Sequence, residues 1–518
     1  MIQAQRAAAA NTFAASRSRF EELCRRLETG EVLALEHHAV EELLRSEGQE
    51  LLRQMFQDHL DLRSVHEQAA PLPAVVGEDG VSRRHVRDDT TRSLRSLLGP
   101  VQVRRLGYEE RGVTSRFPMD AALNLPSDSY SLGVRYLVAL TVASSAYDET
   151  VEVMQVHDGV SVPKRQAEEL ARRAATDFDA FYAQRDAPES TALSSLLILT
   201  TDAKGIIVRK EDLRPATRKA AAASTHKLKT RLSKGEKKYR KRMATVASVY
   251  TVAPYVRDAD RVLAEVMRNG PSERPPRPKP EHKRVWASVS KEPVEVIREM
   301  FDEAERRDPR REKTWAVLVD GDPKQLRLIR REATARGVKV SIVLDFIHVL
   351  QYLWKASTAF HLDDAPEREA WVLERLRQVL LGKAVDVAAG IRRSATRRDL
   401  GAQKRKPVDQ CANYLLKYKA HLRYDQYLAA GLPIASGVIE GACRHLVKDR
   451  MDLGGAHWGL PGAEAVLRLR ALKSSDDFAA YWTFHQEQEY RRNHEAYYRG
   501  AVPRPHRPAA PPKLRLVP

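Results

Sequence analysis

The chain has 518 residues, of which 43% are hydrophobic and 30% are charged, as in ordinary globular proteins. This length has room for about three to four domains, and the composition excludes a fibrous or wholly disordered chain. No apolar run approaches the roughly 20 residues of a membrane helix, the N-terminal residues lack the apolar stretch of a signal peptide, and three cysteines are too few for a disulfide framework. We therefore expect a cytoplasmic protein.

The charge of the chain is more informative. Lys and Arg number 87 against 69 Asp and Glu, which gives a net charge of +18. Such an excess favours a polyanion as partner, because basic side chains release counterions when they neutralise phosphates. The alternative is a basic protein whose charge serves only its solubility.

The N-terminal part of the chain has a helical pattern. Apolar residues recur at helical spacing over residues 17–62, and we assign residues 1–66 to a helical N-terminal region. A loop rich in Gly and Pro follows. Residues 101–104 then alternate between apolar and polar side chains, which predicts a small hairpin.

Residues 147–175 have the pattern of two helices around a tight turn. Gly159 ends the first helix, Ser161 can cap the second, and Pro163 suits the first turn of the second helix. This is the layout of a helix-turn-helix, in which Lys164 and Arg165 would lie near DNA. The alternative is an ordinary helical hairpin. We assign residues 67–190 to a small hairpin plus this helix-turn-helix-like DNA-binding region.

An α/β pattern begins near residue 196. Apolar runs at residues 196–202, 315–320 and 338–345 each end in an acid, and residues 244–254 form a further strand. Helices are predicted between the last strands: Asp322 and Pro323 start one that Gly337 stops. This alternation argues for an α/β domain with parallel strands. Residues 350–432 contain no convincing strand and read as a helical insertion, after which a helix carries Glu440.

Three acids then become candidates for catalysis. Asp202 and Asp320 end strands, and the carboxyl ends of strands meet at one edge of an α/β sheet, where such folds place their sites. With Glu440 they would suit Mg²⁺ or Mn²⁺, and two such ions can act on a phosphodiester. Taken alone, Asp202 and Asp320 could each be a helix or turn cap, and a lone Glu440 means little. Asp322 could replace Asp320, but Asp320 directly follows the apolar run.

Several segments resemble a known family. They are SGVIEGACRHLVKDRMDLGGAHWGLPGAEAVLRLRAL (Ser436 to Leu472), TTDAKGIIVRKEDLR, KYRKRMATVASVYTVAP, VLVDGD, LDFIHVLQYLW and LNLPSDSYSLGVRYLVA. Together they resemble bacterial insertion-sequence transposases of the DDE class, most closely the ISKra-type group, which has Mutator-like relatives. The resemblance covers most of residues 94–498, and its C-terminal block is the most specific.

The resemblance implies a fold and an activity. The fold would be an α/β ribonuclease H-like catalytic core with a helical insertion, preceded by a mainly α-helical DNA-binding region. The core would comprise residues 191–349 and 433–500, followed by a disordered tail at 501–518. The activity would be metal-dependent hydrolysis at transposon ends and strand transfer into target DNA. Asp202, Asp320 and Glu440 would be catalytic and would bind two Mg²⁺ or Mn²⁺ ions.

The resemblance also implies partners and further residues. The partners would be double-stranded DNA, both terminal inverted repeats and target, and further copies of the chain, near the nucleoid. Asp345 and His348 match an acid-x-x-His element of Mutator-like relatives, although His348 could also be a core histidine. Cys443 reads as a small core residue.

The candidates for DNA contact are mostly cations, in the turn-helix segment, the basic run 218–242 and the C-terminal block. Each has an alternative as a solvated, ion-paired or, for the tryptophan, packed side chain. They are Lys164, Arg165, Lys227, Lys229, Lys237, Lys238, Arg240, Lys241, Arg242, Arg444, Arg450 and Trp458.

Two rival functions stay open from the sequence. One is a structure-selective nuclease with the same core and no strand transfer. The other is a catalytically inactive, transposase-derived DNA-binding regulator, against which the presence of all three acids argues.

Overall fold

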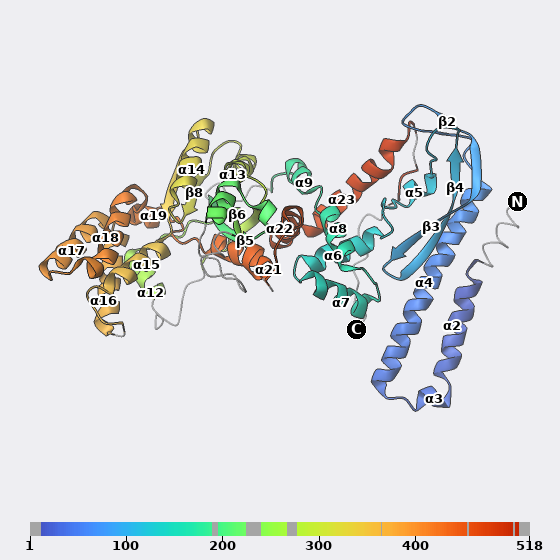
Figure 1. Cartoon of the computed structure of the whole chain (residues 1–518), viewed down its shortest axis with the longest axis horizontal. Helices are drawn as coiled ribbons and strands as arrows, with labels where there is room; N and C mark the ends of the chain where they lie inside the picture. The colour runs from blue at the N-terminus through green and yellow to red at the C-terminus, as the bar shows by residue number, and fades with distance from the viewer. Residues whose placement is uncertain are drawn as a thin grey trace. The chain divides into compact units, whose positions relative to one another are not determined.

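The computed structural model describes residues 12–188, 195–223, 240–266, 277–363, 365–452, 455–500 and 503–506. The chain forms two compact units, one of residues 1–183 with 478–518 and one of residues 184–477. Figure 1 labels many of their helices and strands. Among the described residues, no helix combines the length and apolar character needed to cross a bilayer.

The first unit begins with a helical arm. Helices α2 (Ala14–Leu27) and α4 (His37–Ala69) are joined by the short α3 (Gly30–Leu33). The C-terminal half of α4 packs against a hairpin of β3 (His85–Ser96) and β4 (Gly99–Glu109). This hairpin is much longer than the predicted segment at residues 101–104. The prediction missed β3 because this strand carries many exposed charges and has no clear alternation of apolar and polar side chains. A small pair, β1 (Val75–Val76) and β2 (Ser82–Arg83), precedes it.

The rest of the first unit is helical. Its helices are α5 (Pro118–Ala122), α6 (Leu132–Val142), α7 (Tyr147–Asp158), α8 (Lys164–Ala174), α9 (Phe178–Gln184) and α23 (Phe478–Asn493). Helix α23 packs on α6, with the ring of Tyr136 edge-on to Phe478 at 5.6 Å and Trp482 at 5.1 Å. The assignment of residues 433–500 to the core was therefore wrong for residues after 477, which belong with the N-terminal unit.

The predicted turn between two helices is present at α7 and α8. Gly159 ends α7 with a φ of +63°, a left-handed conformation that suits glycine. The N-cap position of α8 is Pro163, so Ser161 does not cap it as predicted. The exposed Lys164 pairs with Asp148 at 2.6 Å.

The second unit is built on a five-stranded sheet. The strand order is β7-β6-β5-β8-β9, from β5 (Leu196–Ile207), β6 (Lys241–Val252), β7 (Glu281–Ser288), β8 (Thr314–Val319) and β9 (Val340–Leu344). Strands β5, β8 and β9 are parallel, whereas β6 and β7 are antiparallel to their neighbours. The prediction of a parallel sheet was thus correct for three strands only.

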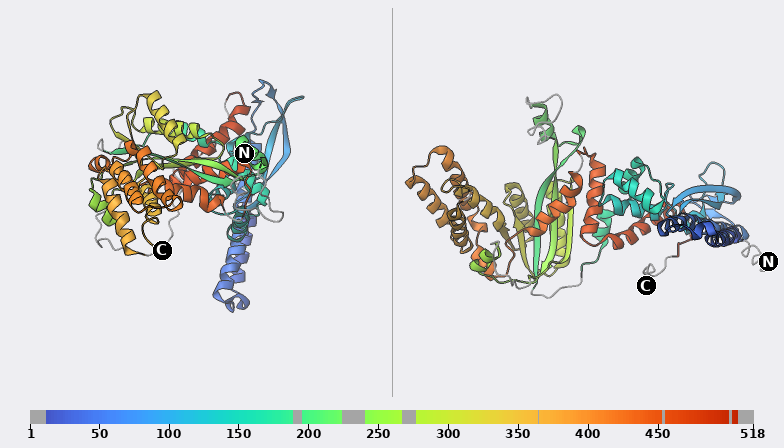
Figure 2. Two further views of the ribbon diagram at one scale, coloured as in Figure 1. Left: turned by 60° about the vertical axis from the view of Figure 1, so that its left-hand side comes forward. Right: turned by 90° about the horizontal axis from the view of Figure 1, so that it is seen from below.

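Strands β5 and β6 form the longest pair of this sheet. They pair from Leu196 with Val252 to Ile207 with Lys241, whereas β8 pairs with β5 only as far as Thr200. The β5–β6 hairpin therefore extends beyond the other strands (Figure 2). Its outer part precedes α10 (Pro215–Ala223).

Helices connect and extend the sheet. Helix α13 (Pro293–Arg307) leads from β7 to β8, and α14 (Pro323–Arg336) leads from β8 to β9. As predicted, Asp322 caps α14 by accepting from the Gln325 N–H at 2.8 Å, and Gly337 ends it with a φ of +62°. A helical region and the last helices follow: α15 (Phe346–Ser357), α16 (Pro366–Leu380), α17 (Ala384–Arg397), α18 (Ala402–Lys417), α19 (Tyr424–Ala429), α20 (Gly437–Ala442), the π-helix η3 (Cys443–Lys448), α21 (Asp449–Met451) and α22 (Leu460–Ser474), with α12 (Ala259–Val266) between β6 and β7.

Candidate active site

Asp202, Asp320 and Glu440 line one cavity of about 420 Å³ in the second unit. They come from β5, from the residue after β8 and from α20. The prediction that Asp202 ends its strand was wrong, because β5 continues to Ile207. Asp202 lies instead just beyond the last residue of β5 that pairs with β8, at the level where the chain leaves β8 at Asp320. Asp202 and Asp320 lie close together because β8 stops just before Asp320, at the level where the neighbouring β5 continues through Asp202.

The charges of these acids act on one another. Burial raises the pKa of Asp320, and the negative charge of Asp202 raises it further, although the Asp322 N–H donates to Asp320 Oδ1 at 2.9 Å. Two carboxylates in a half-buried cavity destabilise each other's charged form unless a cation lies nearby. Carboxylate oxygens are also the ligands that Mg²⁺ and Mn²⁺ prefer. The donor set therefore fits a divalent cation.

A second group of ligand atoms shares Glu440. One oxygen or nitrogen each of Asp345, His348 and Glu440 lie within 4.8 Å of one another. His348 also lines the cavity with Asp202 and Asp320, and it is only half-buried. His348 thus lies at the cavity wall and not in the fully buried core. Glu440 and His348 connect Asp202 and Asp320 with the start of α15.

Asp345 has a different environment, because its carboxylate is buried and surrounded by donors. Oδ1 accepts from the Ile347 N–H at 2.8 Å, and Oδ2 accepts from the Ser436 N–H at 3.3 Å and from the Ser436 hydroxyl. The Ser436 carbonyl in turn accepts from the Glu440 N–H at 3.1 Å. We infer that Asp345 holds the start of α20, and with it Glu440, against the end of β9.

Cys443 is buried, as expected of a small core residue, but its thiol faces the site. Its Sγ donates to Asp202 Oδ2 at 3.2 Å, while the Ala203 N–H donates to Oδ1 at 2.6 Å. Burial and the charge of Asp202 raise the pKa of Cys443. Its place near Glu440 follows from spacing, because Cys443 lies three residues after Glu440, one helical turn away.

Three cations also line the cavity: Lys204, Arg444 and Lys448. Arg444 was predicted; its side chain is 72% exposed and lies 3.6 Å from Asp449. Lys204 and Lys448 were missed, although both have a signal in the sequence. Lys204 lies two residues from Asp202 and so on the same face of β5, and Lys448 follows Arg444 by one helical turn.

Arg450 and Trp458 are corrections to the predicted DNA contacts. Both are buried, with the guanidinium of Arg450 over the Trp458 ring at 4.9 Å. The indole N–H of Trp458 donates to the Met451 carbonyl at 3.0 Å, and its backbone bonds to Ile207. The tryptophan is packed against the protein, so it cannot stack on a base in this conformation.

The remaining predicted contacts divide into four groups. The guanidinium of Arg242 donates to the carbonyls of Asp212, Val289 and Ser290, so we no longer expect it to contact DNA. Arg240 and Lys241 are half-buried at the start of β6, and Lys164 and Arg165 are exposed on α8 of the other unit. Four residues lie outside the described part of the chain: Lys227, Lys229, Lys237 and Lys238.

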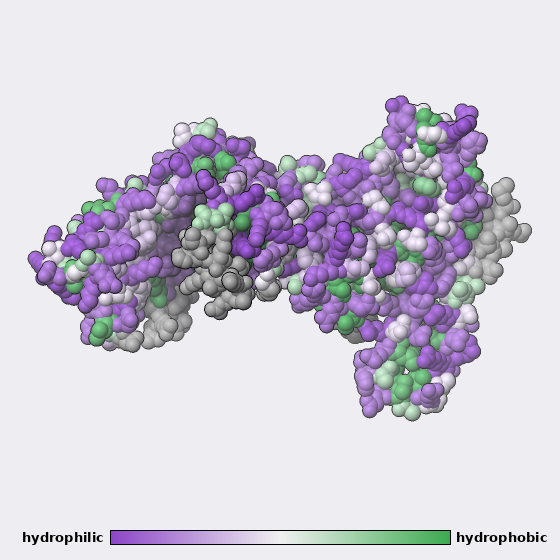
Figure 3. Space-filling model, viewed as in Figure 1, coloured by the Kyte–Doolittle hydropathy of each residue, from purple (hydrophilic) through white to green (hydrophobic). Residues whose placement is uncertain are grey.

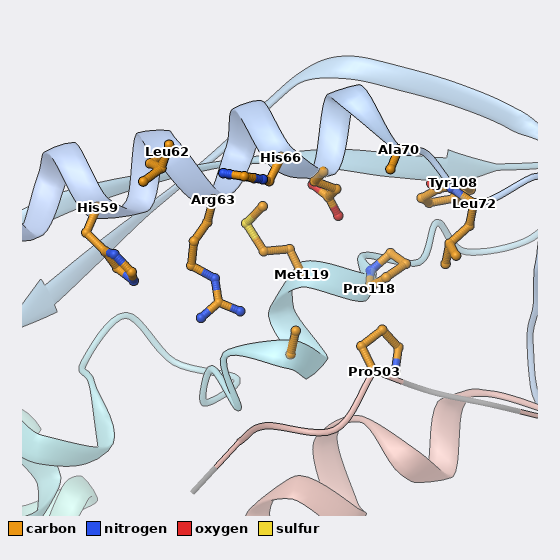
Figure 4. Close-up of a pocket in the computed structure, with 12 residues that line it drawn as sticks. His59, Leu62, Arg63, His66, Ala70, Leu72, Tyr108, Pro118, Met119 and Pro503 are labelled. Atoms are coloured by element: carbon orange, nitrogen blue, oxygen red, sulfur yellow. Dashed lines mark hydrogen bonds between the residues drawn. The ribbon is translucent and has the colours of Figure 1, made fainter. Parts of the chain in front are cut away.

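The first unit contains a larger cavity of about 480 Å³ beside α4 (Figure 4). It is lined mainly by apolar side chains such as Met119 and by His59, Arg63 and His66 of α4. Burial raises the pKa of Glu67 at this cavity, and its carboxylate accepts from the Leu106 N–H at 2.8 Å. A single carboxylate that is already hydrogen-bonded to a strand does not make a metal site, so the acidic cavity of the second unit is the better candidate.

Comparisons with known proteins leave the resemblance a prediction. A scan against models of known protein families found none that matches the chain, and a search of curated proteins found no match.

Proposed function

We propose that the protein is a DNA transposase that cleaves phosphodiester bonds at transposon ends and joins them to target DNA. The observation that carries the proposal is that Asp202, Asp320 and Glu440, which lie 118 and 120 residues apart in sequence, line one cavity. In this proposal, the mixed five-stranded sheet is a ribonuclease H-like core. The basic chain supplies the charge for binding DNA.

Asp202, Asp320, Glu440 and His348 would hold one or two divalent cations. When bound, Mg²⁺ or Mn²⁺ activates an attacking oxygen and stabilises the leaving oxygen of a phosphodiester. Both reactions are in-line displacements at phosphorus. In the first, water breaks the P–O bond to the 3′ oxygen, which leaves as a 3′ hydroxyl. In the second, that hydroxyl attacks a phosphodiester of target DNA, forms a new P–O bond and displaces the 3′ oxygen of the target strand, which leaves as a 3′ hydroxyl.

The side chains around the acids have supporting roles. Lys204, Arg444 and Lys448 line the same cavity and would bind phosphate oxygens next to the reacting group. Asp345 positions the helix of Glu440 through Ser436. The proposed reaction thus uses cations to orient the phosphate and buried hydrogen bonds to fix the acids.

The test uses the full chain, DNA carrying the inverted repeats that flank its coding region, and a target plasmid. Asp202→Asn, Asp320→Asn and Glu440→Gln should each lower cleavage at least about 1000-fold while DNA binding is retained. Asp322→Asn is a matched control, because asparagine also caps helices and the residue lies two positions from Asp320. Retained cleavage in the three acid variants would refute the proposal.

The same assay separates the two rival functions. Cleaved ends without joined products would identify a nuclease. DNA binding without cleavage by the wild-type chain, in Mg²⁺ and in Mn²⁺, would identify a regulator.

A further inference from the structure

The helical arm of the first unit has a thin core. Helix α4 has 33 residues and is therefore about 50 Å long. Its C-terminal half packs against β4, whereas its N-terminal half lies beside α2 and contacts α7, where Arg45 donates to the Val156 carbonyl at 2.7 Å. In α2 and α3 the only buried residues are Ser16 and Val32, and those of α4 all lie between Asp58 and Ser64. Two helices cannot cover all of each other's apolar surface.

Large apolar side chains are consequently exposed along the arm. The described residues include seventeen exposed large hydrophobic side chains, and seven of them lie between Phe20 and Val65. Leu33 is 75% exposed and Phe20 is 56% exposed. Figure 3 shows hydrophobic residues gathered at the end of the arm near α3. Such clustering marks an interaction surface, whereas single exposed apolar residues do not.

Three of these side chains form a stripe on α4. Leu44, Leu52 and Met55 fall within about 80° of one another around the helix, at 100° per residue. The stripe runs along the part of α4 that pairs with α2, as the ion pair of Arg19 with Glu47 shows. An apolar stripe along one helix of a hairpin is the pattern that helical bundles bury.

The charge of the arm argues against DNA as its partner. Residues 14–69 contain seven Arg and no Lys against twelve Asp and Glu, a net charge of −5 in a chain of +18. The two long helices differ in sign: α2 carries +2, and α4 carries −4. A surface with one basic and one acidic helix side by side is complementary to itself when turned by a two-fold axis.

We propose that the arm binds the arm of a second copy of this chain, with α2 of each copy against α4 of the other in a four-helix bundle. The exposed apolar side chains offer on the order of 600 Å² per copy, and the surrounding polar residues bring this near the roughly 800 Å² per partner of a stable interface. This inference does not depend on the proposed activity. It identifies the surface through which two copies associate in the absence of DNA.

The experiment measures the mass of the full chain without DNA, by light scattering or sedimentation from about 1 to 50 µM. The wild-type chain should form dimers. The triple variant L44E/L52E/M55E should raise the dimer dissociation constant at least about 100-fold. Leu362→Glu is a matched control, because Leu362 is 83% exposed in the second unit, and it should leave the constant unchanged.

A charge-reversal series tests the pairing without changing an apolar residue. Arg17→Glu with Arg25→Glu on α2 should weaken the dimer about tenfold, and Glu41→Arg with Glu42→Arg on α4 should do the same. All four changes together should return the constant to within about threefold of wild type. A monomeric wild-type chain, a dimer that the triple variant does not weaken, or a fourfold variant that is not rescued would each overturn the proposal.

Discussion

The buried hydrogen bonds between Asp345 and Ser436 allow a test of how Glu440 is positioned, by substitution at either end. In Asp345→Asn, the side chain keeps its size but loses its charge and one acceptor. Three donors converge on the carboxylate, from Ile347 and twice from Ser436, so at least one of them would face an NH₂ group. Hydrogen bonds to a charged group contribute about 1.5–3 kcal/mol each, and an unsatisfied buried donor costs about 1–3 kcal/mol. We expect a loss of about 2–4 kcal/mol in the free energy of unfolding.

Ser436→Ala is the matched comparison. It removes only the hydroxyl, one of the three donors, and leaves both N–H groups in place. The expected loss is about 1–2 kcal/mol. Both variants are measured by urea unfolding, and strand cleavage is followed in parallel under conditions in which each variant remains folded. Cleavage should fall more in Asp345→Asn than in Ser436→Ala, because only the former disturbs both ends of the link.

Two results would refute this reasoning. The first is an Asp345→Asn variant that unfolds at the same urea concentration as wild type. The second is a Ser436→Ala variant as damaged as Asp345→Asn, since the loss would then come from the hydroxyl alone.

Three further predictions concern other parts of the structure. Burial raises the pKa of Glu303, but the charges of its three arginine partners outweigh burial and lower the pKa from 4.5 to about 2. The ionised carboxylate therefore stabilises the fold above about pH 4.5, and this stabilisation is lost as the pH falls toward 2, so Glu303→Gln should lower the free energy of unfolding by about 3 kcal/mol at pH 7 and by little at pH 2. An equal loss at both pH values in urea unfolding would contradict this cause. Trp458→Ala should cost about 3–5 kcal/mol in stability because Trp458 packs on Arg450; weaker DNA binding with unchanged stability would restore a stacking role. Burial raises the pKa of Cys411 to about 12, and of the three cysteines only Cys24 is not buried. A thiol reagent at about pH 8 should therefore react with one thiol in the native chain and with three in denaturant. Rapid reaction of all three in the native chain would show that the buried cysteines become exposed readily.

Local signals predicted the parts of the fold that depend on neighbouring residues. Asp322, Pro323 and Gly337 define α14 because capping and left-handed turns involve atoms only a few residues apart. The apolar runs before Asp320 and Asp345 form β8 and β9, as predicted, because a short continuous apolar run is also a local signal. By contrast, Asp202 was read as a strand end because it interrupts an apolar run, whereas β5 continues because β6 pairs with it along its whole length.

The site was predictable in its acids and less so in their surroundings. Asp202 and Asp320 lie at one cavity because the parallel strands β5 and β8 are neighbours, and α20 adds Glu440. The burial of Arg450 and Trp458 depends on which segments pack over them, and the β5 residue Ile207, to which Trp458 bonds, lies 251 positions away in sequence. Spacing on a helix or strand would have found Lys204 and Lys448, since each is one period from a predicted residue.

The two-part composition of the first unit affects how the chain is made. Helix α23 emerges from the ribosome after the whole of residues 184–477, yet it supplies Glu489, which pairs with the fully buried Arg135 at 2.5 Å. Until then Arg135 has Asp128 as a partner but lacks Glu489, and the side of α6 that α23 covers is open to water. A premature stop codon shortly before α23 would therefore remove a helix from the first unit and leave all residues of the second unit in place. The unit that loses stability would be the one that lies mostly far from the stop codon in sequence.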